Sequence, residues 1–158
     1  MSVPVVVNTS LALKWVLPQL ALSQESAELL VAWGSQRTRL LVPRLFFSEV
    51  ANALYDYVRN ADPAYPSLTL EQAQASIENL STLVEPADED QAIAERALAI
   101  AVALGRRHMY DEVFVALAER EQCELWTADE KHWNAVKRRY PMVRCVAEPN
   151  LQMGATSS

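Results

Sequence analysis

The chain has 158 residues, a formal net charge of −6 at pH 7 and 51% hydrophobic residues. These values are typical of a single acidic globular domain, and they exclude a disordered or fibrous protein. The only glycines are Gly34, Gly105 and Gly154. Glycine-rich loops of the P-loop or GxGxxG type, which bind nucleotide phosphates, are therefore excluded.

The two cysteines, Cys123 and Cys145, have no CxxC companion of the kind that a zinc site needs. We expect both to be reduced and buried as small hydrophobic side chains. The apolar runs are too short to cross a bilayer, and the amino terminus has no secretory signal. The sequence therefore predicts a cytoplasmic protein that makes no use of a membrane.

The first half of the chain alternates predicted strands and helices. A continuous β-branched run, VPVVV, is typical of a strand buried on both faces of a parallel sheet, and it ends before Asn8. Pro18 interrupts the first helical pattern, Gly34 stops the second, and Pro43 precedes the third. The predicted elements are strands over 3–7 and 39–42, helices over 10–17, 23–33 and 45–59, and a loop over 60–67.

The second half continues the alternation. Thr69 and Gln72 form a capping-box pattern that opens a helix, and Asp88 and Gln91 form a similar pattern before the next one. Gly105 ends that second helix. The predicted helices cover 69–83, 88–104, 110–121 and 129–139, and the predicted strands cover 83–85, 124–127 and 143–146.

Strands that alternate with helices at these spacings indicate an α/β domain with a mainly parallel sheet and helices on both of its faces. We expect one domain over residues 1–148 and a polar, frayed tail over 149–158.

In such a sheet, ligands bind outside the carboxyl ends of the strands. The polar residues expected at this edge are Asn8, Ser10, Glu49, Asp111, Thr127 and Asp129. Glu49 and Asn52 form a polar notch on a helix that is otherwise apolar, so we expect this face to be partly buried. If Glu49, Asp111 and Asp129 converge, their repulsion requires a cation, and oxygen ligands suit Mg²⁺ or Mn²⁺. Phosphodiester hydrolysis is the reaction that such a cluster most often serves.

Each of these acids also has a structural explanation when it is taken singly. Asp111 and Asp129 can be helix N-caps, and Glu49 can pair with Arg44 or Arg59. Spacing alone therefore does not establish a site.

Other polar residues are assigned structural roles. His108 and His132 have no ligand spacing, so we interpret them as surface or hydrogen-bonded histidines. Glu112 and Glu130, which neighbour the site acids, are expected to be solvated.

Four segments in order are VVVNTSLALKW (5–15), VPRLFFSEVANAL (42–54), YDEVFVALAE (110–119) and LWTADEK (125–131). Together they closely resemble the PIN-domain family, especially the VapC-type toxins. The resemblance implies a PIN-like three-layer α/β/α fold and a metal-dependent ribonuclease that cleaves single-stranded RNA. It further implies that Glu49, Asp111 and Asp129 are catalytic and bind Mg²⁺ or Mn²⁺. A homodimer and a VapB-like antitoxin that occupies the active-site groove are also implied.

One position departs from this family pattern. The family carries an aspartate directly after the first strand, where this chain has Asn8 as the fourth metal ligand. An amide oxygen can ligate Mg²⁺ but brings no charge, so metal affinity should fall. The exchange is compatible with weakened or lost cleavage, with a different metal occupancy, or with a deliberate change that suppresses a toxic enzyme. The supporting residues Ser10 and Thr127 can hydrogen-bond ligands or phosphate, and Asn52 is a third supporting residue through its notch with Glu49.

Two other functions are considered. A non-catalytic PIN module that binds RNA or an antitoxin peptide would account for Asn8 and for the negative charge. A receiver-like phosphoacceptor domain is disfavoured, because Asn8 and Thr9 do not supply its acidic pair.

The charge is distributed unevenly along the chain. Residues 45–95 contain ten acids and one base, whereas residues 131–144 contain five bases and no acid. This basic tract can line a path for RNA and predicts weak, salt-sensitive binding.

Overall fold

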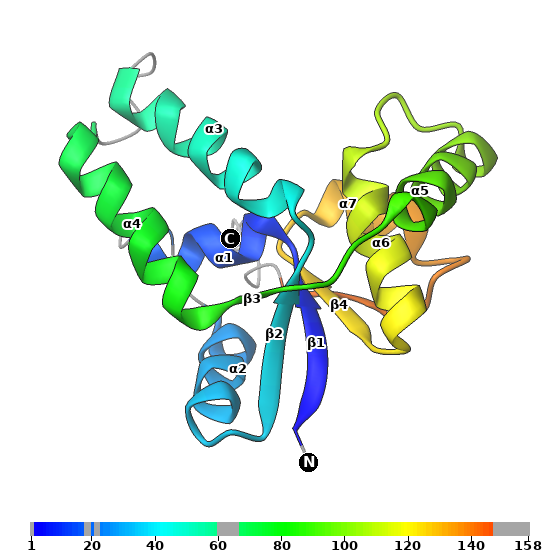
Figure 1. Ribbon diagram of the computed structural model, residues 1–158, viewed down its shortest axis with the longest axis horizontal. Coiled ribbons are helices and arrows are strands. Elements are labelled where there is room, and N and C mark those ends of the chain that lie inside the picture. The colour runs from blue at the N-terminus through cyan, green and yellow to red at the C-terminus, as the bar shows by residue number, and fades with distance from the viewer. Residues whose placement is uncertain (1, 18–19, 21–22, 60–66, 147–158) are drawn as a thin grey trace, which may run out of the picture.

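A five-stranded sheet in which every strand is parallel to its neighbours forms the centre of the protein (Figure 1). The computed structural model describes residues 2–17, 20, 23–59 and 67–146. The strand order is β3-β2-β1-β4-β5. The strands are β1 (Val3–Val7), β2 (Thr38–Val42), β3 (Glu85–Pro86), β4 (Glu124–Thr127) and β5 (Val143–Cys145).

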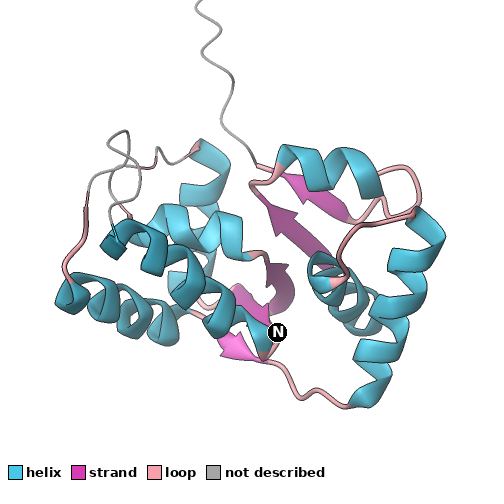
Figure 2. Cartoon of the chain, turned by 90° about the horizontal axis from the view of Figure 1, so that it is seen from above, coloured by secondary structure: helices cyan, strands magenta, loops and turns pink. Residues whose placement is uncertain are grey.

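Helices cover both faces of this sheet (Figure 2). One group consists of α1 (Thr9–Val16), α2 (Gln24–Gly34), α3 (Leu45–Arg59) and α4 (Leu70–Leu83). The other group consists of α5 (Gln91–Leu104), α6 (Tyr110–Glu121) and α7 (Glu130–Val136). The two groups lie on opposite sides of the strands, so the predicted three-layer α/β/α architecture with a parallel sheet is confirmed.

The core forms where the central strand meets the helix beside it. Val6 and Val7 of β1 are fully buried, because β2 and β4 pair with β1 on its two sides and helices cover its two faces. In α6 every residue from Glu112 to Ala118 is buried. A helix that is buried all round has no polar stripe, which explains the continuous apolar run over 113–118.

Most predicted elements are confirmed within one or two residues. The capping box at Thr69 is complete: its side chain accepts from the backbone N–H of Gln72, and the Gln72 side chain accepts from the backbone N–H of Thr69. Some predicted boundaries are wrong. β3 begins at Glu85 rather than at residue 83. α7 ends at Val136 rather than at residue 139, because the chain enters turns there.

The predicted capping box at Asp88 is also wrong. The N-cap of α5 is Asp90, whose carboxylate accepts from the backbone N–H of Ala92 at 3.0 Å. Its extended backbone places the carboxylate over the first turn, and Ile93 at the third helical position cannot complete a capping box.

Two further predictions fall on parts of the chain that the structure does not describe. Residues 60–66 of the predicted loop over 60–67 and the whole tail over 149–158 lie outside the described residues. In the described residues, no helix is long and apolar enough to pass through a bilayer.

No disulfide joins Cys123 and Cys145 in the part of the chain that the structure describes. Both side chains are half-buried rather than fully buried as expected. Burial raises the pKa of the Cys123 thiol to about 11, so this cysteine stays protonated and unreactive at neutral pH.

Gly34 and Gly105 allow a matched test of the helix ends. Gly105 caps α5 in the left-handed conformation at φ 61°, whereas Gly34 is the last helical residue of α2, and neither has an atom within 4 Å of an added Cβ. We expect Gly105→Ala to lower the free energy of unfolding by about 1 kcal/mol through backbone strain. Gly34→Ala should raise it by roughly 0.5 kcal/mol or more, because alanine favours the helix. Urea unfolding of both variants checks this, and equal effects would contradict the assigned backbone roles.

Candidate functional site

Asn8 stands at the junction of β1 and α1, at the carboxyl edge of the sheet. Its side chain is buried, and Oδ1 accepts from both the backbone N–H and the hydroxyl of Ser10, at 3.0 and 2.7 Å. Asn8 is thereby the N-cap of α1. Its backbone N–H donates to the Trp126 carbonyl in β4, so the residue is fixed to both neighbouring elements.

The hydroxyls of Ser10 and Thr127 connect the ends of β1 and β4. The two oxygens lie 3.2 Å apart, and the Ser10 hydroxyl also accepts from the backbone N–H of Ala128 at 3.0 Å. Thr127, which is fully buried, accepts from the backbone N–H of Asp129 at 3.0 Å. The two predicted supporting hydroxyls therefore meet in one network that positions the chain leading to Asp129.

Glu49 lies on α3 with its side chain half-buried. Its Oε1 accepts from the Thr9 hydroxyl at 3.1 Å. The alternative pairing with Arg59 is wrong because Arg59 pairs with Asp56, and no ion pair joins Glu49 to Arg44 in the described residues. Burial raises the pKa of Glu49, as does the nearby charge of Asp111, while the Thr9 hydrogen bond partly opposes the shift.

Asn52 does not share this environment. It is exposed, and no hydrogen bond of its side chain is found within the described residues. The predicted partly buried notch is therefore limited to Glu49, because Asn52 lies on the solvent side of α3.

Asp111 is the second residue of α6, and its side chain is half-buried. Its interpretation as an N-cap is wrong: Met109 occupies that position and makes no side-chain capping bond. Burial is the main cause that raises the pKa of Asp111, and the charges of Glu112 and Asp129 add to it. His132 and Arg106 partly oppose the rise. Asp111 thus interacts electrostatically with the other two predicted site acids.

Asp129 is the N-cap of α7, as its structural interpretation predicted. Its Oδ1 accepts from the backbone N–H of His132 at 3.0 Å. This bond fixes the carboxylate at the start of α7, while the hydrogen bond from its own N–H to Thr127 fixes its backbone.

The donor set has the chemistry that Mg²⁺ or Mn²⁺ prefers. Carboxylates at Glu49, Asp111 and Asp129 supply hard oxygen atoms, and burial, which raises the pKa of the first two, disfavours their charged forms. Among the described residues, no group of three or more His, Cys, Asp or Glu side chains is arranged to hold a metal ion. The shared metal site stays a prediction.

A buried polar network beside these acids was not predicted. Glu112, expected to be solvated, is fully buried, and its Oε1 lies 3.1 Å from His132 Nε2 and 3.2 Å from Arg106 Nε. His132 is buried and hydrogen-bonded, in agreement with one of its two interpretations. The sequence feature that could have indicated the burial of Glu112 is the apolar run that follows it, which is typical of a helix without a solvated face.

His108 and Glu130 are exposed, as predicted.

The raised pKa of Glu49 gives a test of the electrostatics. We expect Glu49→Gln to be more stable than the native protein at pH 7, because the folded state disfavours the ionised carboxylate and the glutamine oxygen can still accept from Thr9. The difference should shrink as the pH falls through the raised pKa and below the ordinary value of 4.5, where Glu49 is protonated in both states. Urea unfolding across this pH range measures it. Glu71→Gln, at an exposed acid of α4, is the control, and a less stable Glu49→Gln at pH 7 would contradict the interpretation.

Comparisons with known proteins agree with this architecture. A structure titled a toxin–antitoxin complex from Klebsiella pneumoniae shows 20% identity and a TM-score of 0.62, covering 92% of this chain and 99% of that chain. VapBC2 from Rickettsia felis, bound to a DNA fragment from its promoter, shows 12% identity and a TM-score of 0.65, covering 93% and 100%. VapBC-1 from nontypeable Haemophilus influenzae shows 15% identity and a TM-score of 0.59, covering 90% and 98%.

These three structures share the fold of this chain at low identity. Among curated proteins, no sequence matches. The family model of the PIN domain, however, matches residues 5–138, a range that includes Asn8, Glu49, Asp111 and Asp129. Because this match spans most of the chain, and because the parallel sheet agrees with it, the protein belongs to the PIN-domain family.

Proposed function

We propose that this protein is a metal-dependent endoribonuclease and the toxin of a VapBC-type toxin–antitoxin pair. The observation that carries the proposal is the position of Glu49, Asp111 and Asp129, three acids on α3, on α6 and at the start of α7, at the carboxyl edge of the sheet within the range that the PIN-domain family matches. The similar structures from toxin–antitoxin complexes support the toxin assignment.

In this proposal Glu49, Asp111 and Asp129, together with the Asn8 amide, hold Mg²⁺ or Mn²⁺. The ion would supply an activated water and would neutralise charge on the phosphate. Residues of the protein would hold these ligands in position. Thr9 orients Glu49, and the Ser10–Thr127 pair fixes the backbone before Asp129. The carboxylates would act as ligands and as proton acceptors.

Asn8 would weaken metal binding without changing the hydrogen bonds at the start of α1. Its Oδ1 already accepts two hydrogen bonds from Ser10, which an aspartate at this position would also accept. The exchange therefore removes one negative charge and leaves the N-cap of α1 intact.

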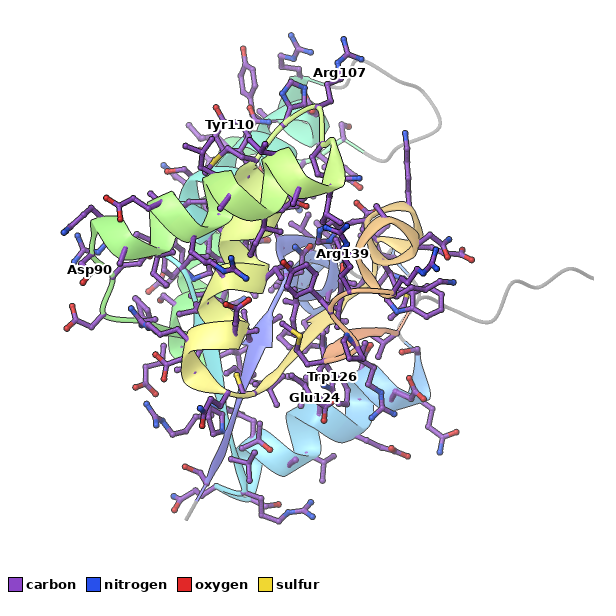
Figure 3. All side chains as sticks on the ribbon, turned by 90° about the vertical axis from the view of Figure 1, so that its right-hand side faces the viewer. Asp90, Arg107, Tyr110, Glu124, Trp126 and Arg139 are labelled. Carbon is purple, nitrogen blue, oxygen red and sulfur yellow. The ribbon has the colours of Figure 1, made fainter. Side chains whose placement is uncertain are left out.

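The surface of α7 and the turn after it supports RNA as the substrate. Elsewhere in the described residues, arginines commonly pair with acids, as Arg39 does with Glu85 and Arg96 with Glu119. Three exposed cations that follow Asp129 have no such partner in the described part of the chain; they are Lys131, Arg138 and Arg139. Figure 3 shows this side of the molecule, with Arg139 labelled near α7. Unpaired cations that begin at Lys131, next to Asp129, and continue past the end of α7 suit the phosphates of a single strand.

The partners are part of the same proposal. A VapB-like antitoxin would cover the site, and the protein would act as a cytoplasmic homodimer. Exposed apolar side chains on α5 and at the start of α6, namely Leu98, Val102 and Tyr110, support association through that face.

A non-catalytic PIN module that binds RNA or an antitoxin peptide is the second candidate function. Asn8 favours it, because the site has one carboxylate fewer than the family pattern and the amide oxygen is already engaged by Ser10.

Cleavage of single-stranded RNA with Mn²⁺ tests the enzyme against this second candidate. We expect Asn8→Asp to increase the rate about tenfold or more, because it restores a charged ligand, and Asp111→Ala to abolish cleavage. Mn²⁺ should also raise the melting temperature of the native protein and not that of Asp111→Ala.

Glu130→Gln, at an exposed acid next to Asp129, is the matched control and should cleave normally. Retained RNA binding without cleavage in Asn8→Asp, and without stabilisation by Mn²⁺, would favour the non-catalytic module.

The proposed RNA surface has its own test. The triple variant Lys131→Gln/Arg138→Gln/Arg139→Gln should bind RNA more weakly and lower the salt dependence of log K by about 2, at about 0.7 for each lost phosphate contact. Fluorescence anisotropy over a salt series measures both quantities.

A triple variant with the same charge change, Arg37→Gln/Arg96→Gln/Arg120→Gln, serves as control. Arg37 precedes β2, and Arg96 and Arg120 lie on α5 and α6, so none of the three belongs to α7 or to the turn after it. Equal losses in the two triple variants would contradict a specific path along α7.

A further inference from the structure

The turn between α5 and α6 carries Arg106, whose side chain lies beside Asp111. Gly105 turns the chain in the left-handed conformation, and the Arg106 backbone N–H donates to the Ala101 carbonyl at 2.9 Å. This closes the end of α5 and fixes the backbone from which the Arg106 side chain extends. The side chain is 22% exposed, so it lies between the protein interior and solvent.

The Arg106 guanidinium lies near two carboxylates without satisfying its donors. Nε is 3.2 Å from Glu112 Oε1, and Nη2 is 3.8 Å from Asp111 Oδ2. The first contact lacks hydrogen-bond geometry, since Nε is buried without an acceptor, and the second is too long for a hydrogen bond. Within the described residues the guanidinium makes no hydrogen bond. Because Nε faces the interior at Glu112, the four N–H donors of the two terminal nitrogens are the ones available to a ligand.

The groups behind Arg106 hold it in this place. Glu112 and His132 are almost completely buried and lie 3.1 Å apart, and the Glu112 carboxylate provides the nearest negative charge for Arg106. The backbone N–H of His132 is bonded to Asp129. Glu112 Oε2 and His132 Nδ1 are also buried without a hydrogen-bond partner in the described residues.

A guanidinium with unused, partly exposed donors is suited to a phosphate group. Its planar fork matches two phosphate oxygens, and charge-assisted bonds of this type are stronger than neutral ones. Arg107 differs: it is exposed and has no ion pair in the described residues, and in Figure 3 it extends away from the body of the domain, as does Tyr110.

We propose that Arg106, anchored by buried Glu112 and placed beside Asp111, forms a phosphodiester-binding subsite of this site. The inference rests on the proposed ribonuclease function and adds a substrate-binding group to it. Arg106 would bind non-bridging oxygens of an RNA phosphate next to the acids. The positive charge of its guanidinium would then offset the repulsion between the carboxylates and the phosphate. The alternative is that Arg106 acts only as a counter-ion for Glu112 and Asp111.

Binding of a non-cleavable 2′-O-methyl single-stranded RNA, measured without divalent metal, tests the subsite independently of catalysis. We expect Arg106→Met to bind about 10-fold more weakly or worse, since bonds to charged groups are lost. Arg106→Lys keeps the charge balance and hence the fold, and it should show an intermediate loss because lysine lacks the fork. Arg107→Met, the matched control, should change binding less than about twofold.

The double variant Arg106→Met/Glu112→Gln separates the two roles. If Arg106 binds phosphate, the double variant stays as weak as Arg106→Met. If Arg106 only neutralises Glu112, removal of both charges restores RNA binding, and the proposal is overturned. Melting curves confirm that each variant is folded.

The outcomes also separate this inference from the proposed function. Equal binding by the native protein and by Arg106→Met, with normal cleavage by Asn8→Asp, would overturn the Arg106 subsite alone. Absence of RNA binding by the native protein, together with no cleavage by Asn8→Asp in Mn²⁺, would overturn both.

Discussion

The repulsion between half-buried carboxylates at one edge of the sheet is the constraint on which the site depends. Burial disfavours the charged forms of Glu49 and Asp111. The charge of Asp111 adds to this effect at Glu49, and the charges of Glu112 and Asp129 add to it at Asp111. Such an arrangement lowers stability at neutral pH unless a cation is nearby. The fold must therefore hold these acids in place through interactions that do not depend on their charge.

Short polar side chains at the ends of β1 and β4 provide those interactions. Asn8 caps α1, and Ser10 connects it to Thr127 and so to the backbone of Asp129. The strands that carry these residues are central and buried, with Val6, Val7 and Leu125 fully shielded. The apolar sheet thus holds these polar residues at its carboxyl edge. Arg106 places a cation beside Asp111, and the buried Glu112–His132 pair lies behind that arginine.

Prediction from sequence succeeded where a residue pattern is tied to local geometry. The run before Asn8 predicted a buried strand, and Thr69 and Gln72 predicted a helix start, because both patterns act within a few residues. It failed at Asp90, where two neighbouring acids compete for the cap, and at Glu112, which was expected to be solvated. The partner of a buried carboxylate lies on another element, here His132 twenty positions away, and no local pattern reports it.

The sequence by itself determined the alternation of strands and helices, the parallel α/β class, and the acids and hydroxyls that stand at the carboxyl edge, because periodicity and capping act over short distances. Only the tertiary structure decided which carboxylates are buried and which groups lie beside them. It placed Arg106 near Asp111, engaged Glu49 with Thr9 rather than with an arginine, and left Asn52 in solvent. Burial and charge pairing depend on how distant segments pack, and those two properties set the chemistry of the site.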